Sequence, residues 1–553
     1  MHRVTPGTLG VMVAHLDDAR LALAAVQALS TTAIARAAEL TGRGERIDDH
    51  QVVVDKVAYA ATEARAAAEV IAAADAAPND ALLAAAAAIV TAELAATARD
   101  RLAQILDELG LDDAAIDAIY TPAVKAAMRR AGSEANVRAL GRMIGESGGR
   151  NTWPLDPTFE SVRSSVRQFA DKEIAPHAEH IHRHDDLIPA RFISAMGELG
   201  YFGLSVPETY GGHELGNLAM ILTTEELSRA SLAAAGSLIT RPEILAKALL
   251  AGGTEAQKKA WLPRLASGEI MVGISVTEPN VGSDVASVAC KAEPATQGGR
   301  VGYEITGAKA WCTFAGRADV LAVLARTDPD PKKGAKGLSL FIVEKPAFDG
   351  HEFETAQPGG GTLSGKADRT PGYRGMHSFT LAFDRWFVPA ANLVGEDAGL
   401  GRGFYLQMAG FAAGRLQTGG RACGLAQAAL EKTAEYVASR TQFGKTTLSF
   451  PLTQFHLGRM AAKLAAARAI TYAAAIAMDS DERQAAPLAA QAKLFACDVA
   501  VEVTQLGQLL HGGWGYAEEY PISRYVVDAQ VLPIFEGVKP ILSLKVVGRA
   551  LLA

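Results

Sequence analysis

Apolar residues recur at helical spacing along most of this chain. The runs 51–76 and 80–109 read as long amphipathic helices, because their apolar positions repeat every three to four residues. Pro78 and Asn79 separate these two runs, and Gly110 follows the second run, as expected at helix ends. The first part of the chain is therefore predicted to be helical.

The apolar pattern changes twice further along the chain. Residues 155–268 are predicted to be helical again. The pattern then becomes typical of β-strands at Ile305, 320–323 and 338–343, which are separated by Gly, Pro and Asp clusters. Long helical runs return after about residue 401, and they comprise 424–438, 454–478 and 485–510.

This order predicts a mostly helical α+β protein and argues against a doubly wound sheet, since alternating β and α units are absent. The glycine-rich stretch 145–151 is a predicted linker. We expect a helical extension, a helical domain, a β domain and a C-terminal helical bundle, at 1–150, 155–268, 269–400 and 401–553.

Charge and cysteine content argue against nucleic-acid binding and against a disulfide-stabilised fold. Lys and Arg number 54 against 61 Asp and Glu, a net charge of −7 over 553 residues. Sequence-independent nucleic-acid binding needs clustered cations, so we expect no nucleic-acid partner. The four cysteines lie far apart without a CxxC pair, which argues against a disulfide framework and is typical of a reducing cytoplasm.

The sequence shows no obvious targeting or membrane segment. No basic stretch followed by an apolar core opens the chain, so no signal peptide is expected. The most apolar run, 81–90, is mainly alanine and meets Glu93 soon after, so it is interpreted as too short and too weakly apolar to span a membrane.

Two stretches resemble a phosphate-binding loop but fail in detail. The run 360–366 is followed by Ala367 where a hydroxyl should hold magnesium, and the run that ends at Lys445-Thr446 has Ser439 in place of its first glycine. No GxGxxG motif follows a strand. Nucleotide hydrolysis and a Rossmann-type dinucleotide site are therefore not expected.

A histidine cluster precedes Asp185 and Asp186. His180 and His184 are spaced to share one helix face and could bind a metal, whereas the alternative is a solvated helix end. The cluster also includes His177 and His182. We predict no metal site.

Several separated motifs become informative together, and they occur in the same order as in one known family. They are 207–212 (PETYGG), 276–284 (VTEPNVGSD), 309–313 (KAWCT), 440–444 (RTQFG), 511–516 (HGGWGY) and 534–537 (IFEG). With these motifs, residues 155–553 resemble the acyl-CoA dehydrogenase family. The resemblance implies FAD, an acyl-CoA substrate, electron-transfer flavoprotein as electron acceptor and a homodimer or homotetramer.

By resemblance, Glu536 is the base that removes the α-proton of the acyl thioester. Removing such a weakly acidic proton needs a placed base and donors for the enolate oxygen. Apolar Ile534 and Phe535 are expected to keep the carboxyl dry and raise its pKa, and Gly537 allows a close approach. Some relatives carry the base one residue before Arg415, but Gly414 has no side chain to serve.

The resemblance also assigns cofactor and substrate contacts. Thr277 and Thr313 match positions that hydrogen-bond the flavin, and Trp311 matches the indole that packs on its face. Arg440 matches the residue that reaches the FAD pyrophosphate of a neighbouring subunit. The remaining implied contacts are Ser283, Gln442, Phe443, Leu509, Gly512 and Gly513 for the cofactor, and Ser283, Arg415, Phe535 and Gly537 for the substrate.

Some positions depart from the family pattern. Where relatives have a threonine and a glutamine that contact FAD, this chain has Val538 and Pro540, so only backbone contact remains there. Gln508 stands one position before the usual glutamine, which aligns with Leu509.

Arg241 lies in the helix that closes the acyl pocket in the family, among Leu and Ile and directly before Pro242. A carboxylate at the far end of an acyl chain would need a cationic partner, so Arg241 is a candidate carboxylate clamp. The alternatives are a solvent-facing helix residue and a CoA contact. Among other classes, an acyl-CoA oxidase remains open, whereas Glu536 and the negative net charge disfavour the DNA-associated relatives of the family.

Overall fold

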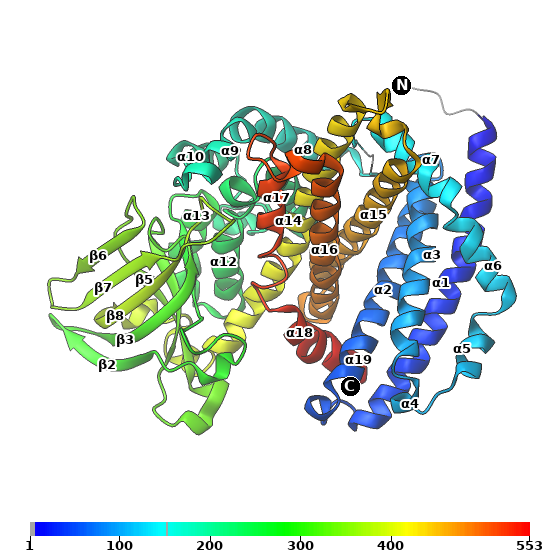
Figure 1. Ribbon diagram of the computed structural model, residues 1–553. Coiled ribbons are helices and arrows are strands. Elements are labelled where there is room, and N and C mark those ends of the chain that lie inside the picture. Colours follow the sequence, from blue (N-terminus) through cyan, green and yellow to red (C-terminus); the bar gives the residue numbers. More distant parts are fainter. Residues whose placement is uncertain (1–5, 151–152) are drawn as a thin grey trace. The chain divides into compact units, whose positions relative to one another are not determined.

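The computed structural model describes residues 6–150 and 153–553, with side chains from residue 15 onward, and divides into two compact units (Figure 1). Unit 1 comprises the chain up to residue 161 and from 418 to the end, and unit 2 comprises 162–417. Asn151, the last residue of the predicted linker, lies outside the described residues. Each unit is described in turn.

The N-terminal part of unit 1 is helical, as predicted. Asp80 caps one helix by accepting a hydrogen bond from the backbone N–H of Leu83, and Gly110 ends another in the left-handed conformation. The predicted helix 51–76 has the same bounds in the structure, whereas the run 80–109 is divided into two helices. The helices are α1 (Pro6–Thr41), α2 (Gln51–Ala76), α3 (Ala81–Ala103), α4 (Leu106–Leu109), α5 (Asp113–Ile119), α6 (Pro122–Ala131) and α7 (Glu134–Glu146).

The C-terminal part of unit 1 is a helical bundle against which the N-terminal helices pack. Helix α7 lies along α15 (Figure 1), and the two helices approach closely because glycines meet at the crossing. A Cβ at Gly141 would lie 1.7 Å from the Gln454 carbonyl oxygen, and one at Gly458 would lie 2.0 Å from that of Val137. The helices are α14 (Gly403–Ser439), which crosses into unit 1 at residue 418, α15 (Pro451–Ser480), α16 (Glu482–His511), α17 (Ile522–Ala529), α18 (Lys539–Ile541) and α19 (Arg549–Leu552).

Three helices in the described part are long and apolar enough to cross a membrane by length and composition alone. They are His15–Thr41, Ala81–Ala103 and Pro451–Ser480. The expectation that 81–90 is too short and too weakly apolar was therefore wrong, since that run belongs to a helix of 23 residues whose mean hydropathy reaches 1.8. Most of this helix is buried inside unit 1, which also accounts for its apolar composition.

Unit 2 begins with helices that surround an apolar core. The core includes Leu249 and Leu262 from two helices and Ile342 from the sheet. The helices are α8 (Pro157–Phe169), which starts in unit 1, α9 (Ala175–His184), α10 (Ala190–Glu198), α11 (Gly216–Ala230), α12 (Thr240–Gly252) and α13 (Glu255–Ala266).

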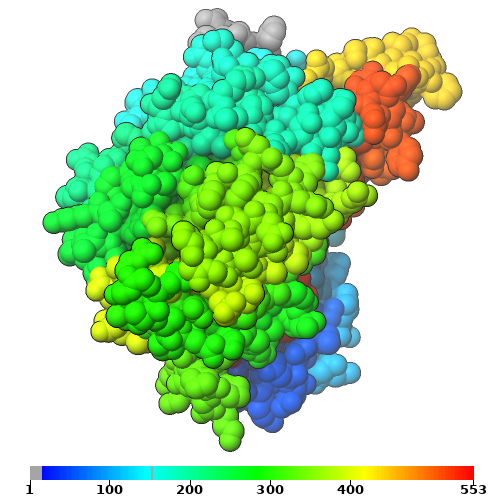
Figure 2. Space-filling model, turned by 90° about the vertical axis from the view of Figure 1, so that its left-hand side faces the viewer, coloured from blue at the N-terminus to red at the C-terminus, as the bar shows by residue number. Residues whose placement is uncertain are grey.

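The predicted β domain is one mixed sheet in unit 2, coloured green to yellow-green in Figure 2. Its strand order is β1-β4-β2-β3-β8-β7-β6, and β5 pairs with β4. The glycine-rich run 360–366 enters strand β7 and not a helix, so it cannot form a phosphate-binding loop. The strands are β1 (Val272–Ser275), β2 (Lys291–Gln297), β3 (Arg300–Thr313), β4 (Val320–Arg326), β5 (Leu338–Glu344), β6 (Glu352–Ala356), β7 (Thr362–Ala367) and β8 (Ser378–Pro389).

Candidate active site

Glu536 lies in unit 1 and forms a buried ion pair that the sequence did not reveal. The fully buried guanidinium of Arg421, on α14, donates to Glu536 Oε2 at 2.6 Å from Nη2. The hydroxyl of Thr418, one turn earlier on α14, donates to the same oxygen and accepts from Arg421 Nη2 at 2.7 Å. The carboxylate therefore has a fixed position.

The backbone around Glu536 is held just as firmly. Glu536 has a φ of 54°, which non-glycine residues rarely adopt, and Gly537 follows with a φ of 99°. A Cβ at Gly537 would lie 2.8 Å from a methyl carbon of Leu542, so only glycine fits. The buried ammonium of Lys493, on α16, donates to the Gly537 carbonyl at 2.7 Å. This turn aims the Glu536 side chain.

The apolar environment expected for Glu536 is only partly present. Ile534 is exposed, and the ring of Phe535 lies 4.6 Å from the guanidinium carbon of Arg421. The expectation that Ile534 and Phe535 enclose the carboxyl was therefore wrong for Ile534. The dominant neighbour of Glu536 is a cation, which apolar neighbours in the sequence could not reveal.

In unit 2, a second buried ion pair joins two of the sequence motifs. Lys309 Nζ donates to Glu278 at 3.0 Å and to the Val276 carbonyl at 2.9 Å. The other contacts of the Glu278 carboxylate are the backbone N–H groups of Ala289 and Cys290, at 2.9 and 2.8 Å. The pair fixes the segment 276–284 against β3.

This arrangement places the predicted flavin-contacting residues of unit 2. The Thr277 carbonyl accepts from the Ala310 N–H at 2.8 Å, so Thr277 lies beside the end of β3. The β3–β8 register shifts between Lys309 and Cys312, and within this irregularity Trp311 has a φ of 57° and is 58% exposed. The irregularity turns the indole outward, while Thr313 stays buried and its hydroxyl shares a hydrogen bond with Ser378 at 2.9 Å.

The predicted FAD contacts of unit 1 lie on two exposed turns. Arg440 precedes a two-stranded hairpin, β9 (Thr441–Gln442) with β10 (Lys445–Thr446). Gln442 lies in β9, and Phe443 at the tip of the hairpin is 93% exposed. Leu509, near the end of α16, is 74% exposed.

The turn after α16 exposes its backbone. Gly512 has a φ of 62°, and a Cβ at Gly512 or Gly513 would meet nothing within 4 Å. The preceding His511 is buried, stacks on Tyr436 at 4.3 Å and contacts the Gly507 carbonyl through Nδ1 at 2.7 Å. Burial lowers the pKa of His511, so the ring is a neutral support for the turn.

Each unit offers exposed groups that suit a dinucleotide. The indole of Trp311 is exposed in unit 2, and the side chains of Phe443 and Leu509 are exposed in unit 1. An accessible glycine backbone and an exposed arginine are the groups that approach a pyrophosphate. Ser283 is exposed and can reach a ligand. Pro540 has no N–H and Val538 no polar side chain, so neither can donate through its side chain.

Arg241 is buried in unit 2 at the start of α12, with 6% of its surface exposed. Its Nη1 donates to the Ser237 carbonyl at 3.2 Å, and its guanidinium carbon lies 6.0 Å from the centre of the Tyr373 ring. Within the described ranges 15–150 and 153–553, no carboxylate lies at ion-pair distance from Arg241. The solvent-facing alternative is therefore wrong.

The sequence did not predict Thr418, Arg421, Lys493, Glu278 or Lys309. For Lys309, Arg421 and Lys493 the signal is a charged residue within an apolar run, since such a residue is rarely buried unless it is paired. Thr418 and Glu278 carry no such signal. Arg415 and Gly414 lie on α14 in unit 2, and Gly414 carries no base.

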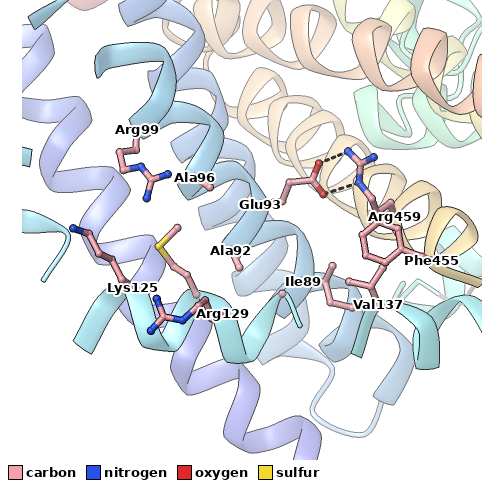
Figure 3. A pocket seen from close by; sticks show the side chains of 12 residues that line it. Ile89, Ala92, Glu93, Ala96, Arg99, Lys125, Arg129, Val137, Phe455 and Arg459 are labelled. Carbon is pink, nitrogen blue, oxygen red and sulfur yellow. Dashed lines mark hydrogen bonds and ion pairs between the residues drawn. The ribbon is translucent and has the colours of Figure 1, made fainter. Parts of the chain in front are cut away.

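A pocket of about 490 Å³ lies elsewhere in unit 1, between α3, α6, α7 and α15 (Figure 3). Arg99, Lys125 and Arg129 gather on one side of it, and the ion pair between Glu93 and Arg459 lies on the other. None of the predicted site residues lines this pocket.

Comparison with known proteins accounts for most of the chain. Family models for acyl-CoA dehydrogenase match at residues 156–269 (N-terminal domain), 273–386 (middle domain) and 401–552 (C-terminal domain). A (2S)-methylsuccinyl-CoA dehydrogenase from Cereibacter sphaeroides is 41% identical over 76% of this chain and 75% of its own length.

Solved structures agree with these matches. Butyryl-CoA dehydrogenase from Megasphaera elsdenii has a TM-score of 0.66 at 32% identity, covering 73% of this chain and 100% of its own. A chain in the structure of the electron transferring flavoprotein of Acidaminococcus fermentans has a TM-score of 0.65 at 32% identity, covering 72% of this chain and 99% of its own. The chain therefore belongs to the acyl-CoA dehydrogenase family and is an FAD-dependent oxidoreductase.

Proposed function

We propose that the protein converts (2S)-methylsuccinyl-CoA to mesaconyl-CoA (2-methylfumaryl-CoA). The observation that carries this substrate is Arg241, a buried cation for which the described residues supply no carboxylate. Burying an unpaired charge is costly, so the position is explained best by a partner that arrives with the substrate. The similarity to a methylsuccinyl-CoA dehydrogenase supports the same substrate.

In this reaction Glu536 removes the proton from the α-carbon of the thioester. The contacts of its carboxylate hold the base in one orientation. A base that is already oriented removes a proton faster than a freely moving water molecule does. Bound FAD would supply the acceptor for a hydride from the β-carbon. Loss of the α-proton and of that hydride leaves one new double bond in the product.

Other residues of the chain bind and orient the two ligands. The exposed indole of Trp311 offers a flat face for the flavin. Thr313, at the end of β3, and Thr277, whose carbonyl pairs with β3, are the proposed hydrogen-bond partners of the flavin. The Arg440 hairpin and the Gly512-Gly513 turn offer contacts to the pyrophosphate. By the family resemblance, Phe535 and Gly537 of unit 1 and Ser283 and Arg415 of unit 2 are proposed contacts of the acyl thioester.

The proposal extends to the partners. Electron-transfer flavoprotein is the proposed electron acceptor, supported by the similarity to a chain of the Acidaminococcus fermentans structure. A homodimer or homotetramer is proposed because Phe443, on the Arg440 hairpin, is exposed in the single chain and a neighbouring subunit would cover it. A cytoplasmic location is proposed from the four buried, free cysteines, and burial raises the pKa of the Cys312 thiol to about 12.

A substrate panel tests the proposed function. The FAD-loaded protein is assayed with methylsuccinyl-CoA, succinyl-CoA and 2-methylbutyryl-CoA, with electron-transfer flavoprotein as acceptor, and kcat/KM is compared. We expect methylsuccinyl-CoA to be preferred over both. Preference for 2-methylbutyryl-CoA would assign the protein to uncharged branched substrates.

The same samples separate a dehydrogenase from an oxidase. After reduction by substrate, the reduced flavin is exposed to air, and the rate of its reoxidation is compared with the rate given by electron-transfer flavoprotein. A dehydrogenase should react faster with the protein acceptor. Rapid turnover with oxygen alone would contradict that assignment.

A further inference from the structure

Two histidines and an aspartate converge in unit 2, and none of them has a role in the proposed reaction. Asp185 ends α9, His351 precedes β6 and His377 precedes β8. One ligand atom from each side chain lies within 4.8 Å of the other two. His377 Nε2 lies 3.2 Å from Asp185 Oδ1, and the rings of His351 and His377 are 4.4 Å apart between centroids.

The distance between Asp185 and His377 suits a tetrahedral ion. Bonds of about 2.0–2.2 Å to zinc place two ligand atoms roughly 3.3–3.5 Å apart, close to the separation of Asp185 and His377. His377 is buried, which fixes its ring before any ion arrives, whereas His351 is exposed and leaves an entry path.

A competing cation lies at the same carboxylate. Arg374 Nε is 3.5 Å from Asp185 Oδ1, and the guanidinium also donates to the Thr370 and His182 carbonyls. Those two carbonyl contacts hold the arginine independently of Asp185. Arg374 and His377 both contact Oδ1, so an ion bound there would replace the hydrogen bond from His377, while the two carbonyls still hold the arginine.

The neighbouring His180, His184 and Asp186 form a second group, which contains the pair that the sequence suggested. All three are exposed, and His180 Nε2 lies 3.1 Å from Asp186. Exposed side chains lose more conformational freedom when they bind an ion than a buried ring does. This group is therefore the weaker site and serves as a matched control.

We propose that Asp185, His351 and His377 bind a divalent transition-metal ion, with zinc as the expected ion, because a set of two imidazoles and one carboxylate is typical of such sites. The ion would secure the segment that supports a flavin-contacting residue. The His377 carbonyl accepts from the Phe314 N–H at 2.8 Å, directly after Thr313.

The test uses the FAD-loaded full chain, freed of metal by chelation and then given zinc. We expect about one zinc ion per chain to remain after gel filtration at micromolar protein. In His351→Gln, loss of one ligand should weaken zinc binding at least about 10-fold, while His184→Gln should bind as the parent does. Cobalt in place of zinc should give absorption in the red, where oxidised flavin does not absorb.

Either of two results would overturn the proposal. One is a parent protein that retains no zinc. The other is zinc binding that His351→Gln leaves intact, whether or not His184→Gln removes it. Because the readout is metal content, it is independent of activity and of the proposed substrate.

Discussion

At the scale of single residues, Glu536 is placed by contacts that leave its carboxylate in one position. Replacing Glu536 with glutamine keeps the size and most of the packing but removes the base. We expect Glu536→Gln to retain FAD while kcat falls by about 10²–10⁴-fold. The exposed Glu435, paired with Lys432, provides the matched control Glu435→Gln, which should behave as the parent. Turnover near the parent's in Glu536→Gln would remove Glu536 from the mechanism.

Arg241 should decide which substrates are accepted. In Arg241→Ala the far carboxylate of methylsuccinyl-CoA would be buried without a partner, and truncating such a pair typically costs about 2–5 kcal/mol. That is roughly a 30- to 4,000-fold loss of kcat/KM. The loss with 2-methylbutyryl-CoA should be small, and Arg241→Lys should recover part of the activity. An equal loss with both substrates would point to CoA binding or fold damage.

The sequence could identify Glu536 and Arg241, but not their neighbours. Glu536 stands in a short motif, and Arg241 is conspicuous among apolar residues. Arg421 and Lys493 are also charges in apolar helices, yet which backbone or carboxylate each meets depends on how α14, α16 and the 534–537 turn pack. Such packing is not encoded in local spacing.

At the scale of elements, the β9–β10 hairpin presents Arg440 and Phe443 to solvent. If Arg440 reaches the FAD of a neighbouring subunit, Arg440→Ala should lower both FAD content and the fraction of oligomer. Lys445→Ala, on the opposite strand of the hairpin, is the control. FAD content by absorbance and mass by light scattering measure the two effects. An Arg440→Ala protein that assembles and holds FAD as the parent does would refute the contact.

The ends of helices and strands could be predicted where a helix-breaking residue marks them, but not where packing or strand pairing alone sets them. Pro78 and Asn79 fall at the break between α2 and α3. The break near Gln104 has no such residue and was missed. The irregularity in β3 that turns Trp311 outward was also missed, because it arises from the pairing of β3 with β8.

At the scale of the whole molecule, the N-terminal helices of unit 1 are joined to the C-terminal bundle by charge as well as by close helix packing. Glu93 on α3 pairs with Arg459 at 2.6 Å and Lys463 at 3.2 Å, both on α15. Burial alone would raise the pKa of Glu93, but the two cations outweigh it and hold that pKa below its ordinary value.

The ion pairs of Glu93 make the stability of the fold depend on pH. Because the pKa of Glu93 is lower in the folded protein, the pair stabilises the fold above about pH 4.5 and is lost as the pH falls through the folded-state pKa. We expect the melting temperature of the parent to fall more steeply than that of Glu93→Gln between neutral pH and about pH 3. Parallel curves for the two proteins would show that the pair contributes nothing.

The order of helical and β-rich blocks was enough to predict the fold class. That order could not predict which helices residues 1–150 pack against, because alanine-rich helices have no distinct apolar face that would identify a packing partner. The paired approach of Gly141 and Gly458 is visible only in the structure. The expectation that 81–90 is too short and too weakly apolar for a membrane span was wrong, since burial within a bundle and burial in lipid select similar residues.

The most direct test of the central claim is a single turnover without oxygen. The FAD-loaded protein is mixed with one equivalent of (2S)-methylsuccinyl-CoA while flavin absorbance is followed, and the thioester is then identified by mass. The account predicts loss of the oxidised-flavin absorbance together with mesaconyl-CoA, lighter than the substrate by two hydrogen atoms. A flavin that stays oxidised with methylsuccinyl-CoA but bleaches with 2-methylbutyryl-CoA would contradict it.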